Sequence, residues 1–169
     1  MIRTCAICIA VLLYAAPGFA HSPKAAMSET LSQDPRNAGL KMSAYWASYV
    51  SSDAIVVSID EIPEAKAPVD ILRVLYQFAA KMEDERRFKF VHLARKGTPK
   101  FMLEGDYLRQ VGREYENGQN PAYLMRTLPQ NVYNLDGTAA FGTWTGGLLG
   151  VTGKQMEDLN NFVMQWLTK

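Results

Sequence analysis

The chain has 169 residues, of which 18 are lysine or arginine and 17 are aspartate or glutamate, for a formal net charge of +1 at pH 7. A nearly neutral chain without a basic stripe is a poor candidate for nucleic-acid binding, and this length predicts a single domain. Both cysteines, Cys5 and Cys8, lie close to the N-terminus, which argues against a thiol enzyme or a cysteine metal site in the rest of the chain.

Residues 1–20 have the three parts of an export signal. Arg3 supplies positive charge, Cys5–Ala16 is an apolar run, and Gly18–Ala20 offers small residues for cleavage. The run is shorter than the ~20 residues that a membrane-spanning helix needs. We therefore expect a signal peptide and a periplasmic or secreted product that begins at His21, contains no cysteine and has no membrane span.

The polar residues 21–33 predict a flexible N-terminal arm, followed by one domain over residues 34–169. Asp34 and Pro35 are typical of an N-cap and the first residue of a helix. Apolar residues then recur at helical spacing, which predicts a helix to about residue 50. They are Met42, Tyr45, Trp46, Tyr49 and Val50.

Strand and helix signals alternate through the middle of the chain. The β-branched run Ala54–Ile59 predicts a buried strand, and Val69–Met82 has an apolar face typical of a helix. Phe88–Arg95 and Lys100–Leu103 predict a hairpin around a Gly-Thr-Pro turn. The first strand, the helix and the next strand would then form a parallel βαβ crossover.

The last third is less regular. Gly105 and Asp106 predict the start of a helix carrying Tyr107, Leu108, Val111 and Tyr115 along one side, and Asn117-Gly118 predicts its end. Tyr123–Leu128 and Ala139–Trp144 are strand candidates, and Gly146–Gly153 favours a structured loop. A final helix is predicted at Lys154–Leu167, with inward residues Met156, Leu159, Phe162, Val163 and Trp166.

These elements predict an α+β fold. We expect a mixed, mostly antiparallel sheet of three to five strands with about four packed helices in a single domain.

The two histidines suggest a metal site. If cleavage follows Ala20, His21 offers an amine and an imidazole, and together with His92 it would make a three-nitrogen copper site. The simpler interpretation is that His92, flanked by Phe88 and Phe90 in a predicted strand, is a core or edge histidine.

Motifs for other chemistry are missing from the sequence. It has no Gly-x-Ser-x-Gly elbow, no His-Glu-x-x-His motif and no phosphate-binding loop. Hydrolysis by paired carboxylates needs only two acidic residues in a cleft. Glu104, Asp106, Glu114 and Glu116 are candidates, although solvated helix-end charges are the commoner role of such residues.

The segment between Tyr115 and Trp144 interleaves aromatic rings, asparagines and one arginine. Tyrosine, tryptophan and arginine dominate binding hot spots, so this segment predicts a binding surface. Its candidate residues are Tyr115, Asn120, Tyr123, Arg126 and Trp144. Alternatively, the rings pack on the sheet and the asparagines satisfy turns.

The first hypothesis is a non-enzymatic exported protein that binds a protein partner or a small ligand, such as an inhibitor, immunity or assembly factor, without a cofactor. The alternative is a carboxylate-dependent hydrolase acting on cell-wall or sugar substrates. A histidine-brace copper binder is the third hypothesis.

Overall fold

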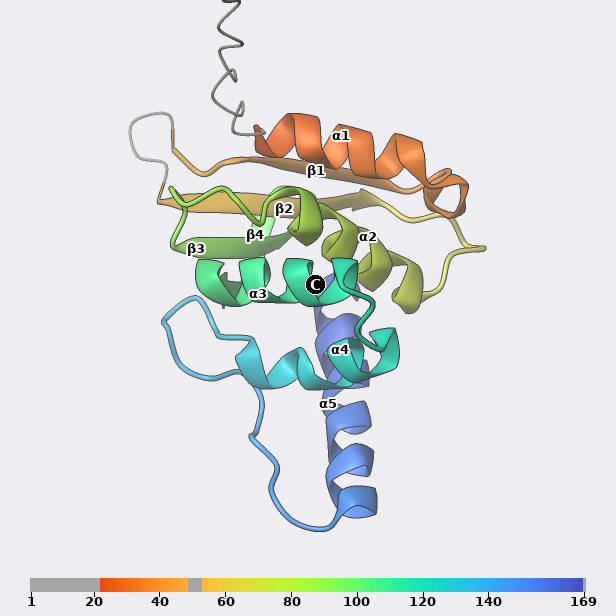
Figure 1. Ribbon diagram of the computed structural model, residues 1–169, viewed down its shortest axis with the longest axis vertical. Coiled ribbons are helices and arrows are strands. Elements are labelled where there is room, and N and C mark those ends of the chain that lie inside the picture. Colours follow the sequence, from red (N-terminus) through yellow and green to blue (C-terminus); the bar gives the residue numbers. More distant parts are fainter. Residues whose placement is uncertain (1–21, 49–52, 169) are drawn as a thin grey trace, which may run out of the picture.

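A four-stranded mixed sheet organises the computed structural model, which describes residues 22–48 and 53–168. The strands lie side by side in chain order, and β1, β2 and β3 can be followed beneath α1 in Figure 1. The two outer pairings are antiparallel, and the central pairing of β2 with β3 is parallel. The strands are β1 (Lys41–Trp46), β2 (Ala54–Glu61), β3 (Phe90–Arg95) and β4 (Thr98–Glu104).

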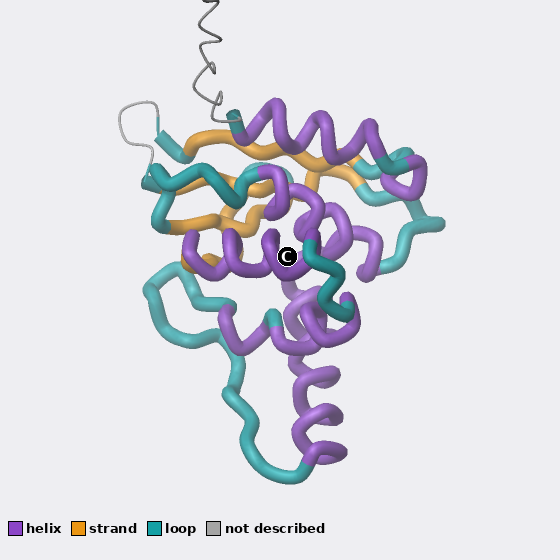
Figure 2. The backbone as a smooth tube through the Cα atoms, in the orientation of Figure 1, coloured by secondary structure: helices purple, strands orange, loops and turns teal. Residues whose placement is uncertain are grey.

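Five α-helices complete the described part of the chain, which confirms the predicted α+β single-domain fold (Figure 2). In the helical layer, α2 lies between α1 and α3. The helices are α1 (Pro23–Gln33), α2 (Pro68–Lys81), α3 (Gly105–Glu116), α4 (Pro121–Thr127) and α5 (Leu148–Thr168), with short 3-10 turns η1 (Pro35–Asn37) and η2 (Pro129–Asn131). None of these described helices combines the length and apolar character that a membrane crossing needs.

One face of the sheet supplies the core. In the parallel pairing Ile55 lies beside Val91 and Val57 beside Leu93, so all four side chains share a face, as the two-residue period of a strand requires. They form a single buried cluster with the inner side of α2. Because α2 connects β2 to β3, the predicted βαβ arrangement of a strand, a helix and a parallel strand is confirmed.

The C-terminal helix closes the same core. Phe162 packs edge-on against Phe101 of β4, with ring centroids 5.5 Å apart. The buried Trp166 donates its indole N–H to the carbonyl oxygen of Ala94 in β3 at 3.0 Å. Helix α5 is therefore joined to β3 and β4 by both packing and a buried hydrogen bond.

The expectation of a flexible arm at residues 21–33 is wrong for Pro23–Gln33, which forms α1. Ser22 caps this helix by accepting from the backbone N–H of Ala25. Ala26 and Met27 are fully buried in the core. The segment looked polar because only one narrow stripe of it faces the core. His21 lies outside the described residues.

The helix predicted after Asp34 is also wrong. Asp34 does cap a helical turn, but the turn is the short η1, and the chain then continues as β1. Gly39 separates the two with φ +84°, a conformation that glycine adopts readily. Met42 and Ala44 then face the core with a period of two. Tyr49 and Val50, which completed the predicted stripe, lie outside the described residues.

Three predictions in the last third need correction. Tyr123–Leu128 is not a strand, because Asn120 caps α4 and Pro121 opens it. Within Ala139–Trp144 only Ala139 pairs with another strand-like residue, through an isolated bridge to Tyr133. Most of the predicted glycine-rich loop, Gly146–Gly153, forms the first turns of α5.

Candidate functional site

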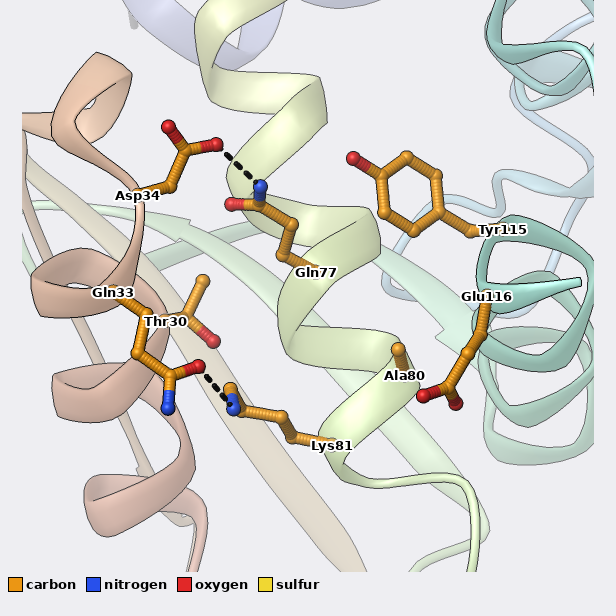
Figure 3. Close-up of a pocket in the computed structure, with 8 residues that line it drawn as sticks. All are labelled: Thr30, Gln33, Asp34, Gln77, Ala80, Lys81, Tyr115 and Glu116. Atoms are coloured by element: carbon orange, nitrogen blue, oxygen red, sulfur yellow. Dashed lines mark hydrogen bonds between the residues drawn. The ribbon is translucent and has the colours of Figure 1, made fainter. Parts of the chain in front are cut away.

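A cavity of about 280 Å³ lies where α1, α2 and α3 meet (Figure 3), and we call it the polar cavity because most of its lining residues are polar. Tyr115 and Glu116 enter it from the end of α3, opposite side chains of α1 and α2. The lining residues are Thr30, Gln33, Asp34, Gln77, Ala80, Lys81, Tyr115 and Glu116.

The polar groups on two walls of this cavity are already engaged with one another. Lys81 forms an ion pair with Glu29 at 2.8 Å and donates to Gln33 at 2.8 Å. Gln77 donates to the carboxylate of Asp34 at 2.7 Å. These contacts connect α2 to α1 and to the turn that follows it, so they hold the helical layer together.

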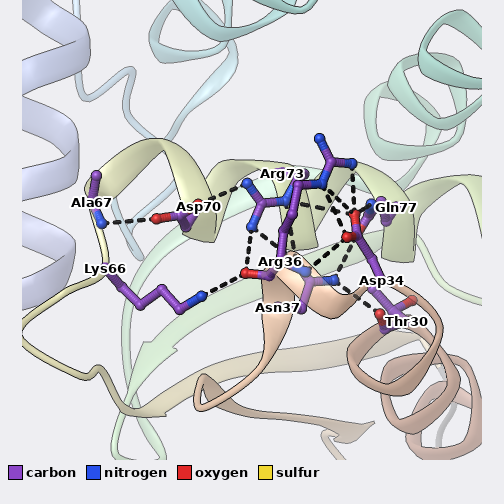
Figure 4. Close-up of polar contacts among 9 residues, drawn as sticks. All are labelled: Thr30, Asp34, Arg36, Asn37, Lys66, Ala67, Asp70, Arg73 and Gln77. Carbon is purple, nitrogen blue, oxygen red and sulfur yellow. Dashed lines mark hydrogen bonds and ion pairs between the residues drawn. The ribbon is translucent and has the colours of Figure 1, made fainter.

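A polar network continues from Asp34 along α2 (Figure 4). The buried Asn37 donates to Gln77 and to the carbonyl oxygen of Thr30, and its own oxygen accepts from Arg73 at 3.1 Å. Every hydrogen-bonding atom of the Asn37 amide therefore has a partner. Burial of such a group is stable only when it is satisfied in this way, so the network has a structural role.

The charges of this network shift the pKa values of two carboxyl groups. Hydrogen bonds from Arg36 and Gln77 hold the pKa of Asp34 well below its usual value. Burial would raise the pKa of Asp70, but hydrogen bonds from the Ala67 backbone and from Arg73 outweigh that effect and lower the pKa. Both carboxylates are thus stabilised in their charged form, which suits ion pairs and not a general acid.

A second cavity has a mostly apolar set of lining residues. An apolar groove of about 350 Å³ runs between the start of α2 and the outer side of α5. Val69 (47 %), Met156 (43 %) and Met164 (54 %) remain exposed along it. The lining residues are Ala67, Pro68, Val69, Leu72, Met125, Met156, Leu159, Asn160, Val163 and Met164. Met156, which the sequence placed inward, therefore borders this groove.

Three of the five predicted binding residues gather around the N-terminal half of α5. Arg126 donates to Gln155 at 2.6 Å and lies over the ring of Tyr123, 5.2 Å from its centroid. Trp144 donates to Asp158 at 2.6 Å. Tyr123 and Trp144 are both partly exposed.

The other two predicted residues lie apart from that group. Tyr115 borders the polar cavity, is half-buried and packs against Tyr76 with ring centroids 6.0 Å apart. Asn120 accepts from the backbone N–H of Ala122 as the cap of α4. The structure therefore divides the predicted binding segment between two places.

His92 lies on the sheet face opposite the core, in register with Val56 and Met102. Burial lowers its pKa, and its Nδ1 atom has no hydrogen-bond partner among the described residues. Those residues also contain no group of three or more histidine, cysteine, aspartate or glutamate side chains placed to hold a metal ion. Because His21 lies outside them, the copper hypothesis is untested.

The acidic candidates for hydrolysis are dispersed. Arg109 donates to Asp106 at 2.6 Å and lowers its pKa, whereas Glu114 accepts from Gln110. Glu104 precedes α3 as an exposed cap residue, and Glu116 borders the polar cavity. The lowered pKa of Asp106 is the reverse of what a general acid requires.

Sequence reasoning missed both the groove and the buried Arg109, whose guanidinium also donates to the carbonyl oxygens of Glu85 and Phe88. A usable signal for the groove was present in α5. Around the helix axis, Leu159, Met156 and Met164 follow one another as an apolar arc. This arc is wider than contact with the core alone requires.

Comparison with models of known protein families, with curated proteins and with solved structures finds no match to this chain. The chemistry of the two cavities is therefore the guide to function. The polar side chains around the first cavity bind one another and so join α1 to α2, whereas the groove presents apolar side chains to solvent.

Proposed function

We propose that this protein is an exported, non-enzymatic binding protein that takes an apolar segment of a protein partner into the groove between α2 and α5. The groove itself carries this proposal. It holds about 350 Å³ between largely apolar side chains, several of which are exposed. Cavities of this size and lining are typical binding sites, and concave apolar surface is stabilised when a partner covers it.

The methionines favour a polypeptide partner. Met125 from α4 and Met156 and Met164 from α5 border the same groove. Methionine is unbranched and polarisable, so its side chain adapts to partners of different shape. An apolar groove beside a helix suits the apolar side of a partner helix.

The polar side chains near the groove would supply its rim. Arg126 follows Met125 in the chain and is held by Gln155, one residue before Met156. Arginine next to an apolar centre is a common feature of protein interfaces. This retains Arg126 as a binding residue, now as part of a rim around α5.

Export is the second half of the proposal, and it rests on the leader at residues 1–20, which lies outside the described residues. N-terminal sequencing of the native protein tests it. We expect a product that begins at His21 and is released with the periplasmic or secreted fraction. A product that begins at Met1 and stays in the cytosol would overturn the export half alone.

A neutral hydrophobic dye, Nile red, tests the groove. We expect dye fluorescence that rises with protein concentration, and a loss of most of it in Met164→Glu, which places a charge at the exposed edge of the groove. Asn161→Glu is the matched control, because it adds the same charge to an exposed position of α5 that does not line the groove.

The same pair of variants tests partner binding. A periplasmic extract passed over immobilised protein should give a captured protein with the wild type and with Asn161→Glu, but not with Met164→Glu. Equal dye binding and equal capture by the two variants would refute the groove as the binding site.

A further inference from the structure

The outer side of α5 carries an apolar seam that the rest of the described chain leaves open. Leu149 is 89 % exposed, the highest value among the large apolar side chains of the described residues. Met156 follows it by seven residues and Met164 by fifteen. Spacings of seven and eight residues return to the same side of a helix, so the three side chains share one side of α5.

The two halves of α5 differ in what surrounds this seam. The first turns of α5 stand away from the sheet and from α2 (Figures 1 and 2). The second half borders the groove, where Leu72 and Val69 of α2 form the facing wall. One helix therefore presents a projecting apolar side chain at one end and an apolar recess near the other.

The part of α5 between Leu149 and the groove leaves room for another helix to approach. Gly153 lies on the seam, and a Cβ atom there would meet nothing within 4 Å. A glycine in the interior of a helix lowers helix stability, and no contact with another described residue explains this one. Close approach of a second backbone is one role that glycine alone allows.

The spacing fits a second copy of the same chain. Leu149 lies seven residues before Met156, and Val163 lies seven residues after it, about 10 Å in each direction along the helix. Two α5 helices that cross antiparallel at Met156 therefore place each Leu149 over the Val163–Met164 end of the other groove. In that register Gly153, three residues before Met156, lies opposite Leu159 of the other copy, three residues after its Met156.

We propose that the groove is occupied by Leu149 of a second copy, in a two-fold dimer built on antiparallel α5 helices. This inference rests on the proposed function, because it names the partner of the same groove. Such an interface uses the same surface on both copies, as two-fold association requires. The formal net charge of +1 provides little repulsion between them.

Cysteine cross-linking tests the register. In a chain with Cys5 and Cys8 replaced by serine, Leu149→Cys together with Met164→Cys should give a disulfide-linked dimer under mild oxidation. Within one chain the two positions are about 22 Å apart along α5, which is beyond the reach of a disulfide. Any disulfide between them therefore joins two copies.

Two controls make this result specific. Leu149→Cys alone should not cross-link, because an antiparallel pair separates the two copies of residue 149 by about 21 Å. Leu149→Cys with Asn161→Cys should not cross-link either, since Asn161 does not line the groove. Efficient cross-linking of the single variant would indicate a parallel pair and overturn the proposal.

Sedimentation tests association without cross-links. We expect a concentration-dependent dimer whose dissociation constant rises at least about tenfold in Leu149→Asp, because a central apolar contact is replaced by a charge. Asn161→Asp should leave it unchanged. Nile red binding per chain should also increase on dilution, as the groove empties.

The outcomes separate this inference from the proposed function. A protein that stays monomeric at all concentrations, while Met164→Glu still abolishes dye binding, refutes the dimer and leaves the groove as a site for another partner. If dye binding is unaffected by Met164→Glu, the proposed function fails. A dimer that is insensitive to Leu149→Asp refutes the α5 interface.

Discussion

At the scale of single residues, Tyr76 is buried together with a polar group that is not hydrogen-bonded to any described residue. Its ring is fully buried in α2, yet its hydroxyl has no hydrogen-bond partner among the described residues. Burial raises the pKa of this phenol well above its usual value, so it is neutral at physiological pH. A buried polar group without a partner loses its hydration without compensation.

Removal of that hydroxyl should stabilise the protein. We expect Tyr76→Phe to raise the free energy of unfolding by about 1 kcal/mol, because the variant keeps the ring and removes the unpaired oxygen. Thermal and urea unfolding of the two proteins measure the difference. A loss of stability in Tyr76→Phe would mean that the hydroxyl has a partner in solution.

Asp34 shows the converse case of a well-paired charge. Arg36, through side-chain and backbone donors, and Gln77 stabilise its ionised form and lower its pKa. Since the folded pKa lies below that of the unfolded chain, the ionised group adds stability above the usual carboxyl pKa near ~4. That contribution is lost as the pH falls through ~4 and below.

Asp34→Asn should therefore be less stable than the wild type at pH 7, with a difference that shrinks towards pH 3. Urea unfolding at pH 7, 5 and 3 measures this difference. Asp84→Asn, at an exposed position, controls for the loss of one negative charge. A difference that is independent of pH would show that the carboxylate charge contributes nothing.

Of the candidate site, individual residue types could be predicted but not their grouping. Arg126, Tyr123 and Trp144 meet around α5, although Trp144 and Asp158 are far enough apart in the chain that no spacing rule links them. Tyr115 was assigned to the same segment but borders a different cavity. Side chains from separate helices come together only through tertiary packing.

At the scale of elements, β1 shows how a local pattern misleads. Met42, Tyr45 and Trp46 fit a helix period, but Met42 and Ala44 also fit the alternation of a strand. Short apolar runs are ambiguous in this way. Pairing with β2 decides the outcome, because residues 41–46 complete the hydrogen bonding of an edge of β2.

The contact between α2 and α3 depends on one glycine. A Cβ atom at Gly112 would lie 2.4 Å from the carbonyl oxygen of Ala79, which no side chain can occupy without movement of the backbone. Gly153 in α5 differs, since a Cβ atom there would meet no other described residue within 4 Å. The same substitution should thus have opposite effects in the two helices.

Gly112→Ala should destabilise the protein by about 1–3 kcal/mol through overpacking. In the monomer, at protein concentrations below the dissociation constant of the proposed dimer, Gly153→Ala should stabilise it by about 0.5–1 kcal/mol, because alanine favours the helix more than glycine does. Urea unfolding of both variants gives the two signs in one experiment. If both variants are destabilised, the space around Gly153 is not open and the prediction for this residue is wrong.

At the scale of the whole molecule, the N-terminal and C-terminal helices belong to one core. Met27 of α1 and Phe162 and Trp166 of α5 join the same buried cluster as the central strands. A cluster that spans the described chain predicts unfolding in one cooperative step.

Tryptophan fluorescence and far-UV circular dichroism test this cooperativity. In a Trp46→Phe, Trp144→Phe background, emission reports on Trp166 alone, at the contact between α5 and β3. We expect its urea transition to coincide with that of the secondary structure. An earlier fluorescence transition would show that α5 detaches before the sheet unfolds.

The sequence by itself determined the α+β class, the central strands, α2, α3 and the end of α5, because each has an apolar period or a cap that acts within a few residues. Tertiary structure decided what local signals leave open. It made β1 a strand through pairing with β2, ordered α1 by burial of Met27, and placed α2 beside α5 so that Val69 and Met164 border one groove. Those outcomes depend on contacts between distant segments, whose free energy is absent from any short stretch of the chain.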